Sequence, residues 1–277
     1  GGGGVVAGSG RGTAHGLAEG LCAEGEPLLL TRALTLALRY RSIGGAGFQA
    51  GLGRPVFDAL REAVGVNTEA FASPLNCYCA AYHSAFADVD APFGSLGTFA
   101  VAQLQRGSFE VNPPFVDGII DAVAAHMLRL LARAQAAAEA LCFVVVLPGW
   151  RDSEGWQALA RSPLRRATLQ IAAADHGFVD GAQHTRRCSF RQSPYDTTLF
   201  ILQTDPAAAA HPLGAEALRR VELAMASCTP TEEDLAQVEL HERVERGSAR
   251  RRLTKRPAKR PAKRPAEIGK PPRSAAR

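Results

Sequence analysis

The sequence lacks the features that define membrane proteins and disulfide-linked proteins. Its longest candidate apolar run, Phe143–Leu147, is far shorter than the roughly 18 residues that a spanning helix needs. Six cysteines are present, but they form no C-x-x-C pair, and the first residues do not resemble a secretory signal. These absences favour a soluble intracellular protein with reduced thiols, no membrane contact and no metal site.

Acidic residues are scarce in the last part of the chain. The 277 residues include 32 Lys or Arg and 27 Asp or Glu, but residues 243–277 hold 14 of the basic and only 2 of the acidic ones. An acidic body therefore precedes a basic tail. Lys255–Ala266 repeats Lys-Arg-Pro-Ala three times, and regular proline with like charge predicts disorder. The Lys-Arg pairs predict nuclear import or non-specific attraction to nucleic acid, with a merely solvated extension as the alternative.

The rest of the chain has the composition of a folded α/β protein, since 46% of all residues are hydrophobic. Apolar spacing predicts helices at 28–41 and 56–64, and after Glu69 short apolar segments alternate with helical ones. We therefore expect a Gly-rich flexible lead-in (1–27), the end of a helical domain (28–68), an α/β domain (69–228) and the tail (243–277).

Within the α/β domain, one strand is expected to be parallel to its neighbours and buried on both faces: the apolar run Phe143–Leu147, which Pro148-Gly149 ends. Other expected elements are strands at 70–75, 107–111, 169–173 and 197–203, and helices at 117–135 and 213–226. A polar stretch between two of these strands contains His176, His184, Arg186, Arg187 and Arg191. A loop of this length is more often functional than idle.

The motif most suggestive of chemistry is Asn112-Pro-Pro-Phe115, which follows an expected strand and precedes a helix. Such a motif can be a plain strand-to-helix turn, because double proline ends a strand and opens a helix. It also fits an enzyme that methylates an exocyclic amino group of a nucleobase. The Asn112 side-chain oxygen and the Pro113 carbonyl can each accept one amino hydrogen, which turns the weak nitrogen lone pair toward the methyl donor. Pro114 would keep the backbone rigid and Phe115 would stack on the base.

A nucleotide-like cofactor would bind at the carboxyl ends of the strands. The usual Gly-rich loop is absent between Ala70 and Asp90, where Phe71-Ala-Ser-Pro-Leu-Asn76 stands instead. We expect Ser73, Pro74 and Asn76 to contact the cofactor. Asp88 or Asp90 could bind its ribose hydroxyls, although a surface Asp is more often simply solvated.

Several motifs together resemble one family, the phosphorylated-CTD-interacting-factor family of cap-specific mRNA (2′-O-methyladenosine-N6)-methyltransferases. The resemblance covers roughly residues 31–226. The segments that carry it are Glu69-Ala-Phe-Ala-Ser-Pro-Leu-Asn-Cys-Tyr78, Phe86-Ala-Asp-Val-Asp90 with Phe93-Gly-Ser95, Gly107-Ser-Phe-Glu-Val-Asn-Pro-Pro-Phe115 and Leu147-Pro-Gly-Trp-Arg151.

The resemblance implies a Rossmann-like class I methyltransferase fold with a mostly parallel sheet, S-adenosylmethionine as the cofactor and the capped 5′ end of mRNA as the substrate. It implies that Asn112–Phe115 hold the cofactor and the target base. Asp117 would face the cap or its ribose, and Trp150, Arg151 and Asp152 would form the cap-side wall. Trp150 could instead simply fill the end of a strand.

The chain also departs from the family pattern. Its only tryptophans are Trp150 and Trp156, so we expect no WW module, and binding to the phosphorylated C-terminal domain of RNA polymerase II is expected only of a full-length form. Asp152-Ser-Glu-Gly155 lacks the Pro-rich continuation of the family. Two alternatives stay open: an adenine-N6 methyltransferase acting on DNA or on internal RNA sites, and an inactive RNA-binding or chromatin-binding protein. We expect the protein in the nucleus.

Overall fold

The computed structural model describes residues 26–43, 49–179, 181, 190–233, 235–236, 240 and 243. The helices are α2 (Glu26–Ser42), α3 (Arg54–Val64), α4 (Ala87–Asp90), α5 (Asp117–Ala136), α6 (Glu154–Ala160), α7 (Asp205–Ala210) and α8 (Ala215–Ala226). The strands are β1 (Thr68–Ala72), β2 (Ala81–Ser84), β3 (Gly107–Val111), β4 (Leu141–Pro148), β5 (Arg165–Ile171), β6 (Gly177–Val179), β7 (Phe190–Gln192) and β8 (Thr197–Gln203).

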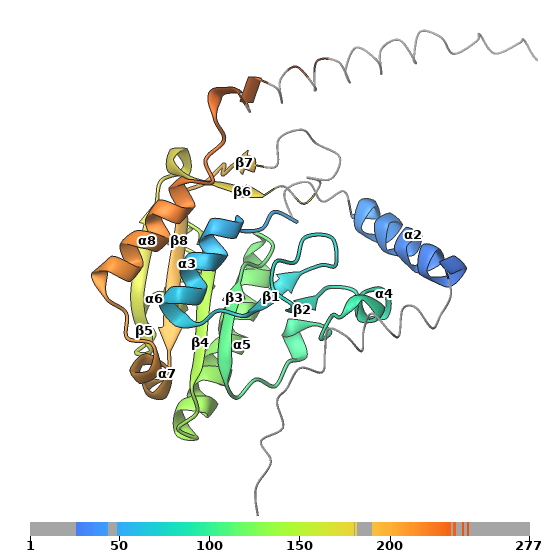
Figure 1. The fold of residues 1–277 in the computed structure, drawn as a ribbon. Helices are drawn as coiled ribbons and strands as arrows, with labels where there is room; N and C mark the ends of the chain where they lie inside the picture. The colour runs from blue at the N-terminus through green and yellow to red at the C-terminus, as the bar shows by residue number, and fades with distance from the viewer. Residues whose placement is uncertain are drawn as a thin grey trace, which may run out of the picture.

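A mixed six-stranded sheet with the order β2-β1-β3-β4-β8-β5 forms the centre of the molecule (Figure 1). The pairs β1–β2, β1–β3 and β3–β4 are parallel, whereas β8 is antiparallel to both β4 and β5. In this sheet β8 is therefore reversed and the other five strands share one direction. Their carboxyl ends meet at one edge of the sheet, which we call the carboxyl edge.

Because β8 is reversed the sheet is mixed, so the expectation of a mostly parallel sheet is met only by the five strands that share a direction. β5 ends at the carboxyl edge, and the chain then passes through β6 and β7 and enters β8 at the same edge. Because no crossover returns the chain to the opposite edge, β8 has to run backwards. β4 was expected to have parallel neighbours and has one, β3, while its other neighbour is β8.

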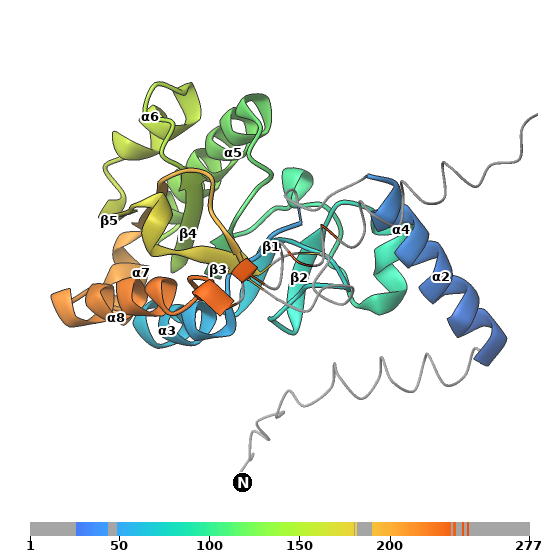
Figure 2. The same cartoon turned by 90° about the horizontal axis from the view of Figure 1, so that it is seen from above.

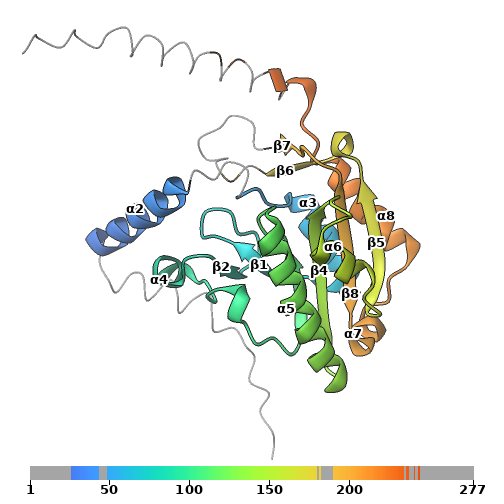
Figure 3. The same ribbon diagram turned by 180° about the vertical axis from the view of Figure 1, so that it is seen from behind.

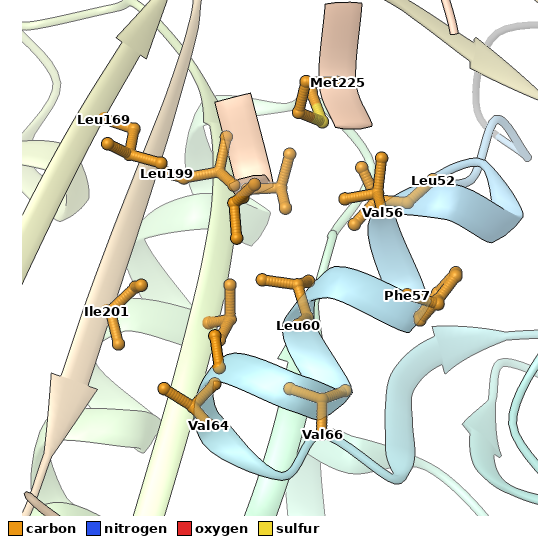
Figure 4. Packing of buried hydrophobic residues seen from close by; sticks show 14 of the residues in the cluster. Leu52, Val56, Phe57, Leu60, Val64, Val66, Leu169, Leu199, Ile201 and Met225 are labelled. Carbon is orange, nitrogen blue, oxygen red and sulfur yellow. The ribbon is translucent and has the colours of Figure 1, made fainter. Parts of the chain in front are cut away.

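Helices cover both faces of the sheet. Figure 2 shows α5 and α6 on one face and α3, α7 and α8 on the other, and Figure 3 shows α5 from behind. All eight residues of β4 are buried, as expected for a strand covered on both faces. On the α3 side, Val56, Leu60 and Val64 pack with residues of β4, β8 and α8 (Figure 4).

α3 is defined by its ends and by this apolar face. Pro55 stands in its first turn, where no backbone donor is needed. Gly65 ends the helix with φ at +71°, and its N–H donates to the Arg61 carbonyl. α3 thus packs into the hydrophobic core on one face of the sheet. The domain boundary placed at residues 68 and 69 stays a prediction.

Most elements with strong sequence patterns are confirmed. β3, β4 and β8 lie where strands were expected, as do α2, α3, α5 and α8, while β1 and β5 are each shifted toward the N-terminus. The shorter elements β2, β6, β7, α4, α6 and α7 were not predicted. The Gly-rich lead-in up to residue 25, His184, Arg186, Arg187 and the tail beyond Arg243 lie outside the described residues. Among the helices that the structure describes, none has the length and apolar character needed to cross a membrane.

Candidate functional site

Asn112–Phe115 leave the sheet at the carboxyl edge directly after β3. The strand ends here because two successive prolines cannot donate ladder hydrogen bonds. The Val116 N–H donates to the Pro114 carbonyl at 2.8 Å, and α5 begins at Asp117. Pro113 is buried, while Asn112 and Phe115 are half-buried. The motif is therefore a rigid turn with two side chains partly open at the edge.

One hydrogen bond sets the orientation of the Asn112 side chain. Its Nδ2 donates to the backbone carbonyl of Ala50 at 3.3 Å. A carbonyl only accepts hydrogen bonds, so the nitrogen must face Ala50 and Oδ1 must face away. Oδ1 accepts no hydrogen bond from the residues that the structure describes. Asn112 thus presents an acceptor that its own fold does not use.

Aromatic rings surround the motif. The Phe115 ring contacts Trp150 edge-on at a centroid distance of 6.4 Å and Phe178 at 6.2 Å. Trp150 in turn contacts Tyr195 at 5.4 Å, with the two rings nearly perpendicular. Phe178 is buried, whereas Tyr195 is exposed. The rings form a row from the core to the surface, past the side chain expected to stack on a base.

The other residues expected on the cap side lie near this row, but some of them are bonded within the protein and others are exposed. Gly149 N–H donates to the Asp196 carbonyl at 2.7 Å, which fixes the turn before Trp150. Arg151 donates to Gln170 Oε1 of β5 at 2.6 Å. Asp117 and Asp152 are exposed. Trp150 therefore lies beside Phe115, while Arg151 is directed along the sheet toward β5.

The loop after β1 is held together by the Asn76 side chain. Asn76 Oδ1 accepts from both the N–H and the hydroxyl of Ser73, each at 2.8 Å. Its Nδ2 donates to the Gln49 carbonyl at 3.0 Å. Ser73 is buried and Pro74 half-buried. Both polar groups of Asn76 are thus engaged within the protein, and its expected contact with a cofactor stays a prediction.

The two candidate ribose ligands have different surroundings. Asp88 is exposed and forms an ion pair with Arg39 of α2 at 3.5 Å. Asp90 is fully buried, and its Oδ2 accepts from the Tyr40 hydroxyl at 2.6 Å and from the Phe86 N–H at 3.2 Å. Its Oδ1 is buried without a hydrogen-bond partner among the described residues. Asp90 therefore joins α4 to α2 and keeps one open oxygen.

Two buried carboxyl groups below the edge were not anticipated. Glu69 of β1 and Glu110 of β3 are register partners on neighbouring strands. Glu69 Oε1 accepts from the N–H groups of Tyr78 and Cys79, each at 2.6 Å. Burial raises the pKa of Glu69 to about 7, and burial together with the charge of Glu69 raises the pKa of Glu110. In the sequence each is a single acidic residue in a short strand, and nothing indicates that the two would be buried side by side.

The structure brings Asn112, Phe115 and Trp150 together and places Ser73–Asn76 on the neighbouring strand end. It adds two contributors that the sequence did not indicate. Tyr195 extends the aromatic row. Ala50 contributes its backbone carbonyl, which every residue type has and which the sequence therefore cannot indicate. In the part of the chain that the structure describes, no group of three His, Cys, Asp or Glu could hold a metal ion.

Comparison with known proteins finds a family model and relatives that match this chain. The family model described as "Phosphorylated CTD interacting factor 1 WW domain" matches residues 22–181, from before α2 to just past β6. The human protein named mRNA (2'-O-methyladenosine-N(6)-)-methyltransferase is 37% identical over 189 residues, covering 64% of this chain and 26% of the human protein. The mouse protein of the same name is 36% identical over the same length. The chain thus spans about a quarter of the length of these relatives.

Proposed function

This chain belongs to the phosphorylated CTD interacting factor 1 WW domain family, and from that premise we propose that its carboxyl edge carries an RNA methyltransferase site. The reaction is the transfer of a methyl group from S-adenosylmethionine to N6 of the 2′-O-methyladenosine beside an mRNA cap. The relatives' name supplies this substrate and this atom. The observation that carries the proposal to this chain is the Asn112 side chain, whose nitrogen is fixed and whose oxygen is open.

The proposal includes a Rossmann-like class I methyltransferase fold, and the mixed α/β sheet is consistent with it. Five strands share a direction, and the loops after β1, β3 and β4 meet at one edge. In open α/β sheets, ligands bind outside the carboxyl ends of the strands. The edge therefore has the place and the loops for a nucleotide-like cofactor and a base.

The residues of the motif have separate roles. Asn112 Oδ1 accepts one hydrogen of the adenine amino group and the Pro113 carbonyl accepts the other. These two acceptors favour the tetrahedral geometry in which the nitrogen lone pair becomes available. Phe115 stacks on the base from the aromatic row with Trp150. The methylated nitrogen is acidic and releases its proton to water, so no strong general base is required.

The residues present fit S-adenosylmethionine, which when bound supplies an electrophilic methyl group. Asp90 Oδ1 is a buried acceptor without a partner among the described residues, and a ribose hydroxyl is a donor of the kind it lacks. Asp88 is less suited because it pairs with Arg39 at the surface. Ser73 and Pro74 after β1 and Asn112–Phe115 after β3 would hold the rest of the molecule.

The cap side of the site would use the outer part of the aromatic row. Trp150 and the exposed Tyr195 offer ring surface to a purine. Asp117 and Asp152 are exposed near the same edge, and Arg151 could contact phosphate if it exchanged its bond to Gln170. The acidic body makes such local contacts necessary, because it does not attract RNA by its overall charge.

A methylation assay with labelled methyl donor tests the proposal. Its substrates are capped RNA beginning with 2′-O-methyladenosine, the same RNA without the cap, an RNA with only internal adenosines, and duplex DNA. We expect methylation of the first substrate alone. Equal methylation of uncapped RNA or DNA would establish a general adenine-N6 methyltransferase, and RNA binding without methylation of any substrate would establish an inactive binding protein.

We further propose that the basic tail directs the protein to the nucleus. The support is the threefold Lys-Arg repeat within residues 255–264. Deleting residues 250–277 from a fluorescent fusion should shift the protein out of the nucleus. Unchanged nuclear location after this deletion would contradict the proposal.

A further inference from the structure

Three consecutive residues, Gln49–Gly51, cross the carboxyl edge and bond to four separate segments. We call them the strap. The Gln49 side chain donates to the Tyr40 carbonyl of α2 at 3.1 Å. Its own carbonyl accepts from Asn76 at 3.0 Å, and the next carbonyl, that of Ala50, accepts from Asn112 at 3.3 Å.

The strap is anchored at its other end by Gly51. This residue forms an antiparallel bridge with Val179 of β6, through hydrogen bonds of 3.0 and 2.8 Å. Close packing adds to the bonding, because a side-chain carbon at Gly181 would lie only 2.3 Å from the Gln49 side chain. With both ends fixed, the Ala50 carbonyl has little freedom to move away from Asn112.

We propose that the strap is a positioning element for the reaction, and that its Ala50 carbonyl requires asparagine, not aspartate, as the first residue of the motif. The inference rests on the proposed function, since it concerns the acceptor of the amino hydrogen. It goes beyond that function by naming a segment, remote in sequence from the motif, that sets which atom of Asn112 faces the substrate.

The chemistry behind this requirement is the difference between an amide and a carboxylate. An amide donates to the Ala50 carbonyl through Nδ2 and keeps Oδ1 for the substrate. A carboxylate has two acceptor oxygens and no donor. It would place one oxygen against the carbonyl at the 3.3 Å distance now held by Nδ2, and the two would repel. A protonated carboxyl group, in contrast, can donate to the carbonyl and still accept from the substrate.

The substitution Asn112→Asp therefore has a distinctive expected result. The introduced carboxyl group should titrate at least about one pH unit above the ordinary value near 3.9, because only its protonated form satisfies the carbonyl. The methylation rate should rise as the pH is lowered toward that midpoint. The wild-type rate should show no such rise, because an amide does not titrate. An ordinary midpoint together with a wild-type pH profile would overturn the proposal.

A matched pair at Gly51 tests the strap without changing the motif. Gly51→Pro removes the N–H that donates to Val179. Gly51→Ala keeps that N–H and places its methyl group in open space. We expect Gly51→Pro to lower the maximal methylation rate about tenfold, because the Ala50 carbonyl loses one of the hydrogen bonds that hold it against Asn112. The Michaelis constant for RNA should change less, and Gly51→Ala should behave as the wild type.

The side-chain amide signal of Asn112 in nuclear magnetic resonance gives a second measurement that does not depend on activity. In Gly51→Pro the signal should shift and its protons should exchange faster with water, whereas in Gly51→Ala both should stay unchanged. Equal behaviour of the two variants would overturn the proposal. If wild-type protein methylated none of the RNAs, the proposed function would fail, and the amide signal and the carboxyl titration would still decide the role of the strap.

Discussion

Asn76 and Asn112 stand at the ends of neighbouring strands, and both donate their side-chain nitrogen to a carbonyl of the strap. They differ in the hydrogen bonds of the side-chain oxygen, Oδ1. Asn76 Oδ1 accepts two hydrogen bonds from Ser73, whereas Asn112 Oδ1 accepts none from the described residues. The same residue type at the same edge is therefore structural in one loop and available to a substrate in the other.

The difference extends to how each loop is stabilised. The loop after β1 is held by side chains: Asn76 bonds to Ser73, and Glu69 bonds to the N–H groups of Tyr78 and Cys79. The loop after β3 is held by two prolines and by ring contacts of Phe115. Rigidity that comes from proline and ring packing leaves polar groups free. The proposed chemistry would thus use the loop whose shape does not depend on its polar side chains.

The largest expected effect is that of Asn112→Ala. Removing one of the two proposed acceptors for the amino group should reduce the methylation rate by about 10³-fold, the effect of removing a positioned polar group from an active site. The unfolding free energy should fall by only about 1 kcal/mol, because one partly exposed hydrogen bond is lost. A single-turnover assay and thermal unfolding give both values. A near-normal rate would show that Asn112 is as structural as Asn76.

The next effect concerns Glu69, which supports the loop after β1. Its pKa in the folded protein is about 7, against an ordinary value of 4.5. Between pH 4.5 and 7 the folded state therefore binds more protons than the unfolded state. The contribution of protonated Glu69 to the free energy of unfolding is complete below pH 4.5 and is lost as the pH rises through 7. Glu69→Gln should remove the Glu69 part of the pH dependence, roughly 3 kcal/mol at pH 8, and leave the part that the buried Glu110 contributes. Urea unfolding at pH 5 and pH 8 measures it.

Glu62→Gln provides the matched control, because Glu62 is exposed on α3 and pairs with Arg220 at the surface. This variant should keep the pH dependence of the wild type. If Glu69→Gln kept it as well, the buried carboxyl group of Glu69 would not be its source.

The sequence predicts the elements of this fold whose patterns are strong in a short window. β4 is a continuous apolar run and α5 has an apolar face, so both are recognisable without neighbours. β2 and β6 are only 4 and 3 residues long. They are strands because of the partners they meet, which no local pattern shows. The direction of β8 likewise depends on the path of the chain across the edge.

The candidate site divides in the same way. Asn112–Phe115 are recognisable because the residue types themselves suit the proposed chemistry. The strap is not, since Ala50 contributes a backbone carbonyl that every residue has. Ser73–Asn76 were recognised by position, but the hydrogen bonds that close this loop on itself become visible only in three dimensions.

A smaller effect is expected for Asn76→Ala. The substitution removes three hydrogen bonds and leaves the buried Ser73 hydroxyl without its acceptor, so the unfolding free energy should fall by about 2 kcal/mol. The affinity for S-adenosylhomocysteine, measured by titration calorimetry well below the unfolding temperature, should change by less than about threefold, since no contact is lost directly. A loss of affinity of a hundredfold or more would show that Asn76 is a cofactor ligand, as the sequence predicted. Asn76 would then no longer be purely structural, and it would not differ from Asn112 in this respect.

The smallest effect is expected for Asp88→Ala, which separates the two candidate ribose ligands. The ion pair of Asp88 with Arg39 is 3.5 Å long and exposed on both sides, and such pairs contribute at most about 1 kcal/mol. Neither stability nor affinity for S-adenosylhomocysteine should change measurably. A many-fold loss of affinity would instead place Asp88 in the cofactor site. In that case the loop after β2 would resemble the loop of Asn112, because its exposed carboxylate would bind a ligand in addition to its surface partner Arg39.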